Sequence, residues 1–430
     1  MLMRRLHPSL LRGGLLVLLG NVLTTAMNLA AVIVTIRHLS LEAFGTLTLT
    51  LTTMQLVAML SNAGLNETLM TMVSRAEAAE QRHEVVATLS AILRLRLLMT
   101  AVVVAGGLLL AGAVAQSALG QPALALPLVL GVVGACGVSL YQFSMTTLQA
   151  FRAYARYALG DVVRYGTILI GATALAMTQR LDLMAAIAIN VSAPFVAFAA
   201  NIAFGSLRGL RLWGDPFVLL PRIWDFSKWV WLSNVCSMFF SRLEIYFLMM
   251  FTSASEVGIY SAAFKLCGPI HLLETATRAV LFPEVSRRAG LQNLASFVRR
   301  SLLPLTAISI AVWCLGFATA PLIPVLLGDR YETAAPIFVI LLAARVALIP
   351  LVPLTLLFFA TDRTRAGAMA AVIQLIILAA GGLILIPNYG AAGAAWTQNL
   401  VTAGAVVYIA IFAWSRLVSP GLRVRAVTDE

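Results

Sequence analysis

The 430-residue sequence is 60% hydrophobic and only 11% charged, with a mean hydropathy of +0.93. Soluble domains carry about 25% charged residues, so this composition excludes a water-soluble fold and predicts an all-α polytopic membrane protein. The formal charge is +12; in a soluble protein this excess would suggest nucleic acid, but in a membrane protein it first indicates topology.

Apolar segments of roughly 20 residues, the length of a spanning helix, recur along the whole chain. Twelve are predicted, at 13–36, 43–64, 92–114, 123–147, 162–178, 183–206, 226–251, 256–283, 301–327, 333–360, 366–387 and 390–415. The longest connection, 65–91, has the apolar spacing of an amphipathic helix. The sequence has no motif for ATP hydrolysis or for a zinc or serine hydrolase, so no cofactor and no metal are predicted.

The basic residues fall almost entirely in alternate connections between the predicted spans. The opposite connections hold only Arg37, Arg180 and Arg330. Because Lys and Arg accumulate in cytoplasmic loops, both termini are predicted to be cytoplasmic. Attraction to anionic inner-leaflet lipid, about 1 kcal/mol per residue, accounts for the basic excess. No nucleic-acid partner is therefore predicted.

Two stretches of the sequence resemble each other. LSLEAFGTLTLT at 39–50 is echoed by TSASEVGIYSAA at 252–263, and in this alignment Gly45 corresponds to Gly258. Internal similarity of this kind is typical of transporters built from two halves. The predicted parts are an N-terminal lobe of six spans at 1–206, a cytoplasmic linker at 207–225, a C-terminal lobe of six spans at 226–415 and a cytoplasmic tail at 416–430. A central cavity is expected between the two lobes.

Four cations near the cytoplasmic ends of predicted spans are assigned to the cytoplasmic connections: Arg94, Arg96, Arg164 and Lys228. Seven other ionisable residues are predicted to lie within spans, all in the C-terminal lobe: Arg242, Glu244, Lys265, His271, Glu274, Arg278 and Arg345. A charge at membrane depth is costly and marks a candidate functional site. Lys265 precedes Gly268 and Pro269, where a kink would free backbone carbonyls. Arg345 precedes Pro350, which should break or bend its helix. Neither cation has an acid at helical spacing, so both are candidates for binding phosphate.

The remaining intramembrane charges form two groups. His271, Glu274 and Arg278 lie on one helical face, either as a self-neutralising group at a wet helix end or as a functional cluster. Arg242 and Glu244 are two residues apart and cannot face each other on a regular helix. Each of them therefore needs a partner elsewhere.

Several motifs, in their order along the chain, resemble those of one family. They are LSLEAFG (39–45), SNAGL (61–65), LQAFRAYARYALGD (148–161), SRLEIYFLMMFTSASEVGIYSAAFKL (241–266) and LFPEVSR (281–287). In these motifs the chain is similar to the polysaccharide transport or lipid-linked oligosaccharide flippase family of the MOP superfamily. The resemblance implies a MATE-like fold of about twelve helices in two six-helix lobes, around a V-shaped cavity that opens alternately inward and outward.

The resemblance also implies the substrate and its surroundings. The expected activity is transfer of undecaprenyl-diphosphate-linked oligosaccharide repeat units, for O-antigen, exopolysaccharide or capsule, across a bacterial inner membrane. A polysaccharide polymerase and co-polymerase are the implied protein partners. Positive charge for the diphosphate would come from Arg242, Lys265, Arg278 and Arg345, and candidates for proton or sodium coupling are Glu244, His271 and Glu274. Glu244 stands where the family-like pattern has Asp.

Two other functions are open at this stage. A MATE-type, cation-coupled multidrug antiporter takes cationic substrates, so acids should dominate its cavity, whereas bases outnumber acids in the predicted spans. A membrane polysaccharide polymerase or ligase needs a substantial outer loop for catalysis, and the predicted outer connections are only a few residues long. The sequence therefore favours a flippase and predicts that the chain is not an enzyme.

Overall fold

The computed structural model describes residues 8–205, 243–287, 291–355 and 364–417. All regular structure within these ranges is helical. By internal packing the chain divides into two compact units, Met1–Gly258 and Ile259–Glu430. The linker predicted at 207–225 lies outside the described residues, as does Arg242.

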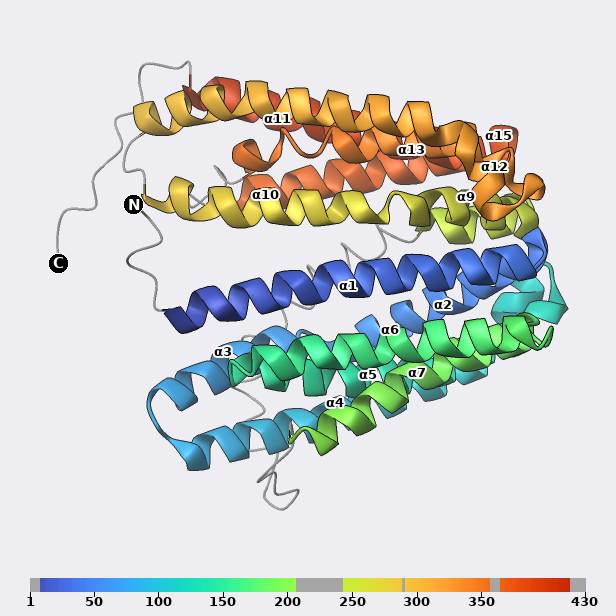
Figure 1. The fold of residues 1–430 in the computed structure, drawn as a ribbon, viewed down its shortest axis with the longest axis horizontal. Coiled ribbons are helices and arrows are strands. Elements are labelled where there is room, and N and C mark those ends of the chain that lie inside the picture. Colours follow the sequence, from blue (N-terminus) through green and yellow to red (C-terminus); the bar gives the residue numbers. More distant parts are fainter. Residues whose placement is uncertain (1–7, 206–242, 288–290, 356–363, 418–430) are drawn as a thin grey trace. The chain divides into compact units, whose positions relative to one another are not determined.

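The first unit is a bundle of long helices with short connections. They are α1 (Pro8–His38), α2 (Leu41–Asn62), α3 (Leu65–Ala78), α4 (Arg82–Ala113), α5 (Ala125–Ala150), α6 (Tyr154–Met177) and α7 (Leu183–Ala203). A π-helical turn (Val114–Ala118) and a 3₁₀ turn (Pro122–Leu124) join α4 to α5, and residues 243–251 are also helical. Within this unit α1 packs against α6, and α5 packs against both α2 and α7 (Figure 1).

Local sequence sets the boundaries of α2. The Ser40 hydroxyl accepts a hydrogen bond from the backbone N–H of Ala43 at 3.1 Å, which caps the first turn. At the other end Ala63 and Gly64 both adopt left-handed backbone angles, with φ of 48° and 73°. These two residues end α2 and turn the chain into α3.

The connection predicted as one amphipathic helix at 65–91 is two elements, so that prediction is wrong in its second half. The first element, α3, buries Leu65, Leu69 and Val73 along one face. The chain then turns at Glu80, whose φ is 57°, and Arg82 begins α4. The apolar residues after this turn belong to the membrane-spanning helix.

Small residues allow α5 to approach its neighbours closely. A Cβ atom at Gly131 would lie 2.6 Å from the backbone oxygen of Thr50 in α2. Helices in a bilayer associate mainly through such close backbone packing, because lipid chains are as apolar as leucine. Met54 and Val57 of α2 and Val132 of α5 form a buried cluster beside this crossing.

The helices of the second unit are interrupted more often. They are α10 (Gly268–Arg287), α11 (Leu291–Thr319), the short α12 (Ile323–Leu327), α13 (Ala334–Val346) and α15 (Thr364–Leu417), preceded by α9 (Ala254–Leu266), which starts in the first unit. In this unit α13 packs against α11 and α15. A non-helical residue, Gly390, divides α15 at the boundary between the spans predicted at 366–387 and 390–415.

Both breaks predicted beside cations are confirmed. The helix that carries Lys265 ends at Leu266, and the next helix starts at Gly268. The helix that carries Arg345 ends at Val346, because Pro350 cannot continue the hydrogen-bond ladder.

Eight helices in the described part of the chain are long and apolar enough to cross a membrane. They are Leu16–His38, Leu41–Asn62, Arg82–Ala118, Pro122–Ala150, Tyr154–Met177, Leu183–Ala203, Arg300–Leu327 and the kinked Met369–Ile411. The span predicted at 226–251 lies mostly outside the described residues. The chain is therefore an all-helical, multi-pass membrane protein.

Candidate functional site

Two of the predicted phosphate-binding cations, Lys265 and Arg345, lie at broken helix ends in the second unit. The Arg345 guanidinium lies over the ring of Phe264, 4.5 Å from its centroid, and so connects the end of α13 to α9. Lys265 directly follows Phe264, and both cations are half-buried. A cation over an aromatic ring gains about 0.5–2 kcal/mol, with the larger values where water is excluded. The N–H donors of a guanidinium lie in its plane and are suited to an anion.

Their position at helix C-termini gives these cations a second role. Lys265 and Arg345 occupy the last turns of α9 and α13. Carbonyl groups at a helix end carry partial negative charge, and a nearby cation stabilises them by typically about 0.3–1 kcal/mol. A substitution here must therefore be judged by transport at equal protein level.

The predicted ion-coupling residues lie on two different helical segments. Glu244, in the helical segment 243–251, is only 2% exposed. On α10 the Nδ1 atom of His271 lies 3.6 Å from Oε2 of Glu274, which confirms that these two residues share a face. His271 is 74% exposed and Glu274 is 21% exposed. The backbone of Arg278 continues the same helix, whereas its side chain lies outside the described part of the molecule.

The structure also buries a charge that the sequence prediction assigned to a cytoplasmic connection. Arg96, in α4, is 1% exposed. Its Nη1 group donates to the backbone oxygen of Ser139 at 2.8 Å, and its Nη2 group donates to the side-chain oxygens of Asn66, at 2.6 Å, and Asn62. The expectation that ionisable residues lie inside spans only in the C-terminal lobe is therefore wrong.

A second buried polar cluster lies between α5 and α6. The hydroxyl of Tyr141 donates a hydrogen bond to Oδ1 of Asp161. The Arg164 guanidinium lies over the rings of Tyr141 and Tyr165, with centroid distances of 5.2 and 5.4 Å. A partly buried carboxylate with a phenol donor and a nearby cation can hold a proton or a small cation.

Helical periodicity was the signal that would have revealed these residues. Val85, Leu89, Ile92 and Arg96 follow one another at spacings of four, three and four, so Arg96 lies on the buried face of α4. The span expected at 162–178 in fact begins at Tyr154, so Asp161 lies inside α6 and Arg164 lies well away from its end. Both expected spans begin about ten residues too late, so residues that lie well inside α4 and α6 are interpreted as residues at the end of a span.

A family model described as "Polysaccharide biosynthesis protein" matches residues 10–288, well over half of the chain. The chain belongs to the polysaccharide biosynthesis protein family. Its resemblance to flippases, stated from the motifs, is thereby confirmed at the level of the family. This is a family of transporters, so the chain is not an enzyme, and the polymerase or ligase alternative is excluded.

One curated relative adds to this family assignment. It is described as "Probable low-salt glycan biosynthesis flippase Agl15" from Haloferax volcanii, and it is 23% identical over 177 residues. The alignment covers 40% of this chain and 38% of that relative, so the chain matches little more than a third of the relative's length.

Solved structures share the fold at low sequence identity. The inward closed conformation of the lipid II flippase MurJ has a TM-score of 0.72 at 15% identity, with 93% of this chain and 87% of that chain covered. An inward-facing multidrug resistance MATE family transporter of the MOP superfamily also has a TM-score of 0.72 at 15% identity, with 92% and 95% covered. This family member therefore has the MATE/MurJ-like fold. The two similarities are equal, so the fold alone does not choose between a flippase and an antiporter.

Proposed function

We propose that this chain is a flippase for lipid-linked oligosaccharides. It moves undecaprenyl-diphosphate-linked repeat units of O-antigen, exopolysaccharide or capsule from the cytoplasmic to the outer leaflet of a bacterial inner membrane. The observation that carries the proposal is the family match over residues 10–288, which the glycan flippase relative supports. Twelve spans in two lobes, with both termini cytoplasmic, complete the proposed topology. Anionic inner-leaflet lipid, a polysaccharide polymerase and a co-polymerase are the proposed partners.

In this proposal the diphosphate is held by cations of the second unit. Arg345 presents a planar fork of N–H donors that matches phosphate oxygens, and its contact with the Phe264 ring holds the guanidinium beside α9. Lys265 and Arg278 of the same unit are proposed to add positive charge. Arg242, which lies outside the described residues, is proposed as a further cation. Alternating access then carries the head group across, while the lipid chain stays in the bilayer.

Arg345→Ala is expected to slow transport of a diphosphate-linked oligosaccharide about ten- to hundredfold at equal protein level. Hydrogen bonds to charged groups contribute about 1.5–3 kcal/mol, and each 1.4 kcal/mol is a factor of ten. Arg345→Lys should be intermediate, because it keeps the charge but loses the planar fork. Transport in proteoliposomes measures the effect, with Arg180→Ala, at an exposed connection, as the control. Wild-type transport by Arg345→Ala would contradict the role of this cation.

Ion coupling is proposed at titratable side chains, with Glu244, His271 and Glu274 as the candidates and Asp161 added by its contact with Tyr141. Glu244 is the most deeply buried of these groups for which an exposure is given, so it is the first to test. A proton or sodium gradient across proteoliposomes should accelerate transport by the wild type. Glu244→Gln should remove this acceleration but leave the transport that occurs without a gradient unchanged. Glu42→Gln, an exposed acid in α2, is the control. Unchanged gradient dependence in Glu244→Gln would move the coupling site elsewhere.

A multidrug antiporter is the second candidate, because the MATE transporter matches the fold as well as MurJ does. The two functions differ in the charge of their substrates. An antiporter should move a dye cation and leave a diphosphate-linked oligosaccharide in place. Testing both substrates on one proteoliposome preparation distinguishes them.

A further inference from the structure

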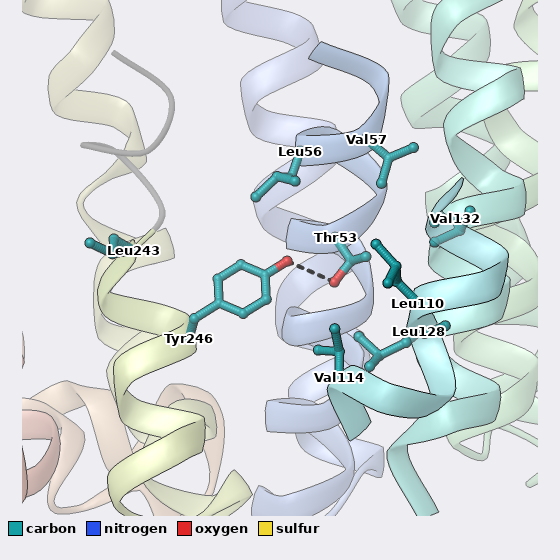
Figure 2. A pocket seen from close by; sticks show the side chains of 11 residues that line it. Thr53, Leu56, Val57, Leu110, Val114, Leu128, Val132, Leu243 and Tyr246 are labelled. Carbon is teal, nitrogen blue, oxygen red and sulfur yellow. Dashed lines mark hydrogen bonds between the residues drawn. The ribbon is translucent and has the colours of Figure 1, made fainter. Parts of the chain in front are cut away.

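An apolar cavity in the first unit is not used by the cation sites. Its volume is about 270 Å³. The lining residues come from α2, α4, the π-helical turn, α5 and the segment 243–251: Thr53, Leu56, Val57, Gly107, Leu110, Ala111, Val114, Leu128, Val132, Leu243 and Tyr246. Figure 2 shows their side chains around the space. No residue of this described lining is charged, so the cavity is unsuited to the diphosphate, to a free ion or to a cationic drug.

The two polar groups of the lining satisfy each other. The Tyr246 ring extends from the segment 243–251 toward α2, and its hydroxyl lies 2.9 Å from Oγ1 of Thr53 (Figure 2). Each hydroxyl therefore already has a hydrogen-bond partner, and a polar ligand would gain little there. The occupant that fits is a hydrocarbon chain. Apolar cavities of about 150 Å³ already bind small hydrocarbons, so this one has room for several carbon units.

Apolar residues of α4 at and beside the cavity are exposed. Leu110 lines the cavity and is 60% exposed, and next to it Leu109 is 83% exposed. An apolar surface on a membrane-spanning helix faces lipid, so a chain can enter sideways from the bilayer. In the proposed topology α4 ends at the outer surface, and the cavity is in the outer half of the membrane.

We propose that this cavity binds the head-proximal part of the polyprenyl chain of the lipid carrier after its head group has reached the outer leaflet. The inference rests on the proposed function, which supplies the carrier. An uncharged lining complements the uncharged isoprenoid. Seating the chain in the outer half of the membrane would favour the outward stage of transport.

Photolabelling of the reconstituted full-length protein tests this proposal. The probe is a polyprenyl phosphate with a photoreactive group near its head, and the comparison probe is a phosphatidylcholine with the same group on an acyl chain. The polyprenyl probe should label the peptide that contains Leu110 and Val114, and unlabelled polyprenyl phosphate should compete. Leu110→Trp, which fills the cavity, should reduce labelling about tenfold, the effect of losing about two buried methylene groups. Leu109→Trp is the matched control, because it adds the same ring on the neighbouring exposed position.

The outcomes separate this inference from the proposed function. Equal labelling by the phospholipid probe would overturn the inference, because any acyl chain would then fill the cavity. Undiminished labelling of Leu110→Trp would overturn it as well. A second variant that fills the cavity, Val114→Trp, should reproduce the loss of labelling. Agreement between the two variants shows that the loss does not come from a local folding defect of Leu110→Trp. If the protein labels as expected but translocates no oligosaccharide, the chain site stands and the flippase proposal fails.

Discussion

Arg96→Met should lower the free energy of unfolding of the protein in detergent by about 3 kcal/mol, within the 3–5 kcal/mol typical of breaking a buried charged network. Arg96 is 1% exposed and donates to groups on three elements: Asn62 at the end of α2, Asn66 in α3 and Ser139 in α5. Methionine has a similar length but no donor. The variant therefore removes the Arg96 donor from two buried oxygens, of Asn62 and Ser139, and from the part-buried oxygen of Asn66. A buried acceptor that is left unsatisfied costs about 1–3 kcal/mol, and the Asn62 oxygen keeps the backbone N–H of Asn66. Part of that cost is offset because no buried charge remains.

The same substitution should loosen α3 selectively. The side-chain oxygen of Asn62 also accepts the backbone N–H of Asn66 at 3.2 Å, so Arg96 holds both ends of the turn between α2 and α3. Hydrogen exchange of residues 65–78 should accelerate more than exchange in α7. Arg82→Met, an exposed arginine at the start of the same helix, removes the same charge and should change stability by less than about 0.5 kcal/mol. Equal stability of the two variants would contradict a structural role for Arg96.

Gly45→Ala should destabilise the protein by about 3 kcal/mol or abolish its accumulation in the membrane. A Cβ atom at Gly45 would lie 1.7 Å from the backbone oxygen of Ala254. A backbone atom at that distance cannot rotate away, so a helix must shift, and overpacking of this kind typically costs about 1–3 kcal/mol or more. The reciprocal contact is present too, since a Cβ atom at Gly258 would lie 2.3 Å from the backbone oxygen of Leu41.

A matched substitution controls for the loss of glycine itself. Gly106→Ala places the same methyl group on α4, where nothing lies within 4 Å of the added Cβ. This variant should be neutral or more stable by up to about 1 kcal/mol, because alanine is the better helix former. Thermal unfolding of the two variants in the same detergent measures the difference. If Gly45→Ala were as stable as Gly106→Ala, the close contact between α2 and α9 would be wrong.

Hydropathy and proline placement predicted much of this fold. The apolar segments of the first half became α1, α2 and α4–α7, because a bilayer forces each apolar stretch to satisfy its own backbone as a helix. The breaks beside Lys265 and Arg345 could also be predicted, since Gly268–Pro269 and Pro350 act locally. The alignment of Gly45 with Gly258 came from the internal repeat alone, and the structure shows a close crossing at these two glycines.

The buried charges could not be found in the same way. A hydropathy window treats Arg96 and Asp161 as signs of a helix end, whereas their partners, Asn62, Ser139 and Tyr141, come from other helices. When the hydrogen-bond partners of a buried side chain lie on other helices, the sequence of its own segment does not indicate that the side chain is buried. The contact of Arg345 with Phe264 is of the same kind, since the two residues are far apart in the sequence and meet only in the folded unit.

Translocation of a labelled lipid-diphosphate-linked oligosaccharide by the purified protein in liposomes tests the central claim most directly. The measured quantity is the fraction of oligosaccharide that is accessible to a reagent outside the liposomes. We predict that substrate initially on one side becomes accessible on the other faster than in protein-free liposomes, and that Arg345→Ala slows this exchange about ten- to hundredfold. No exchange of the oligosaccharide, together with transport of a dye cation by the same preparation, would contradict the flippase proposal and favour the antiporter.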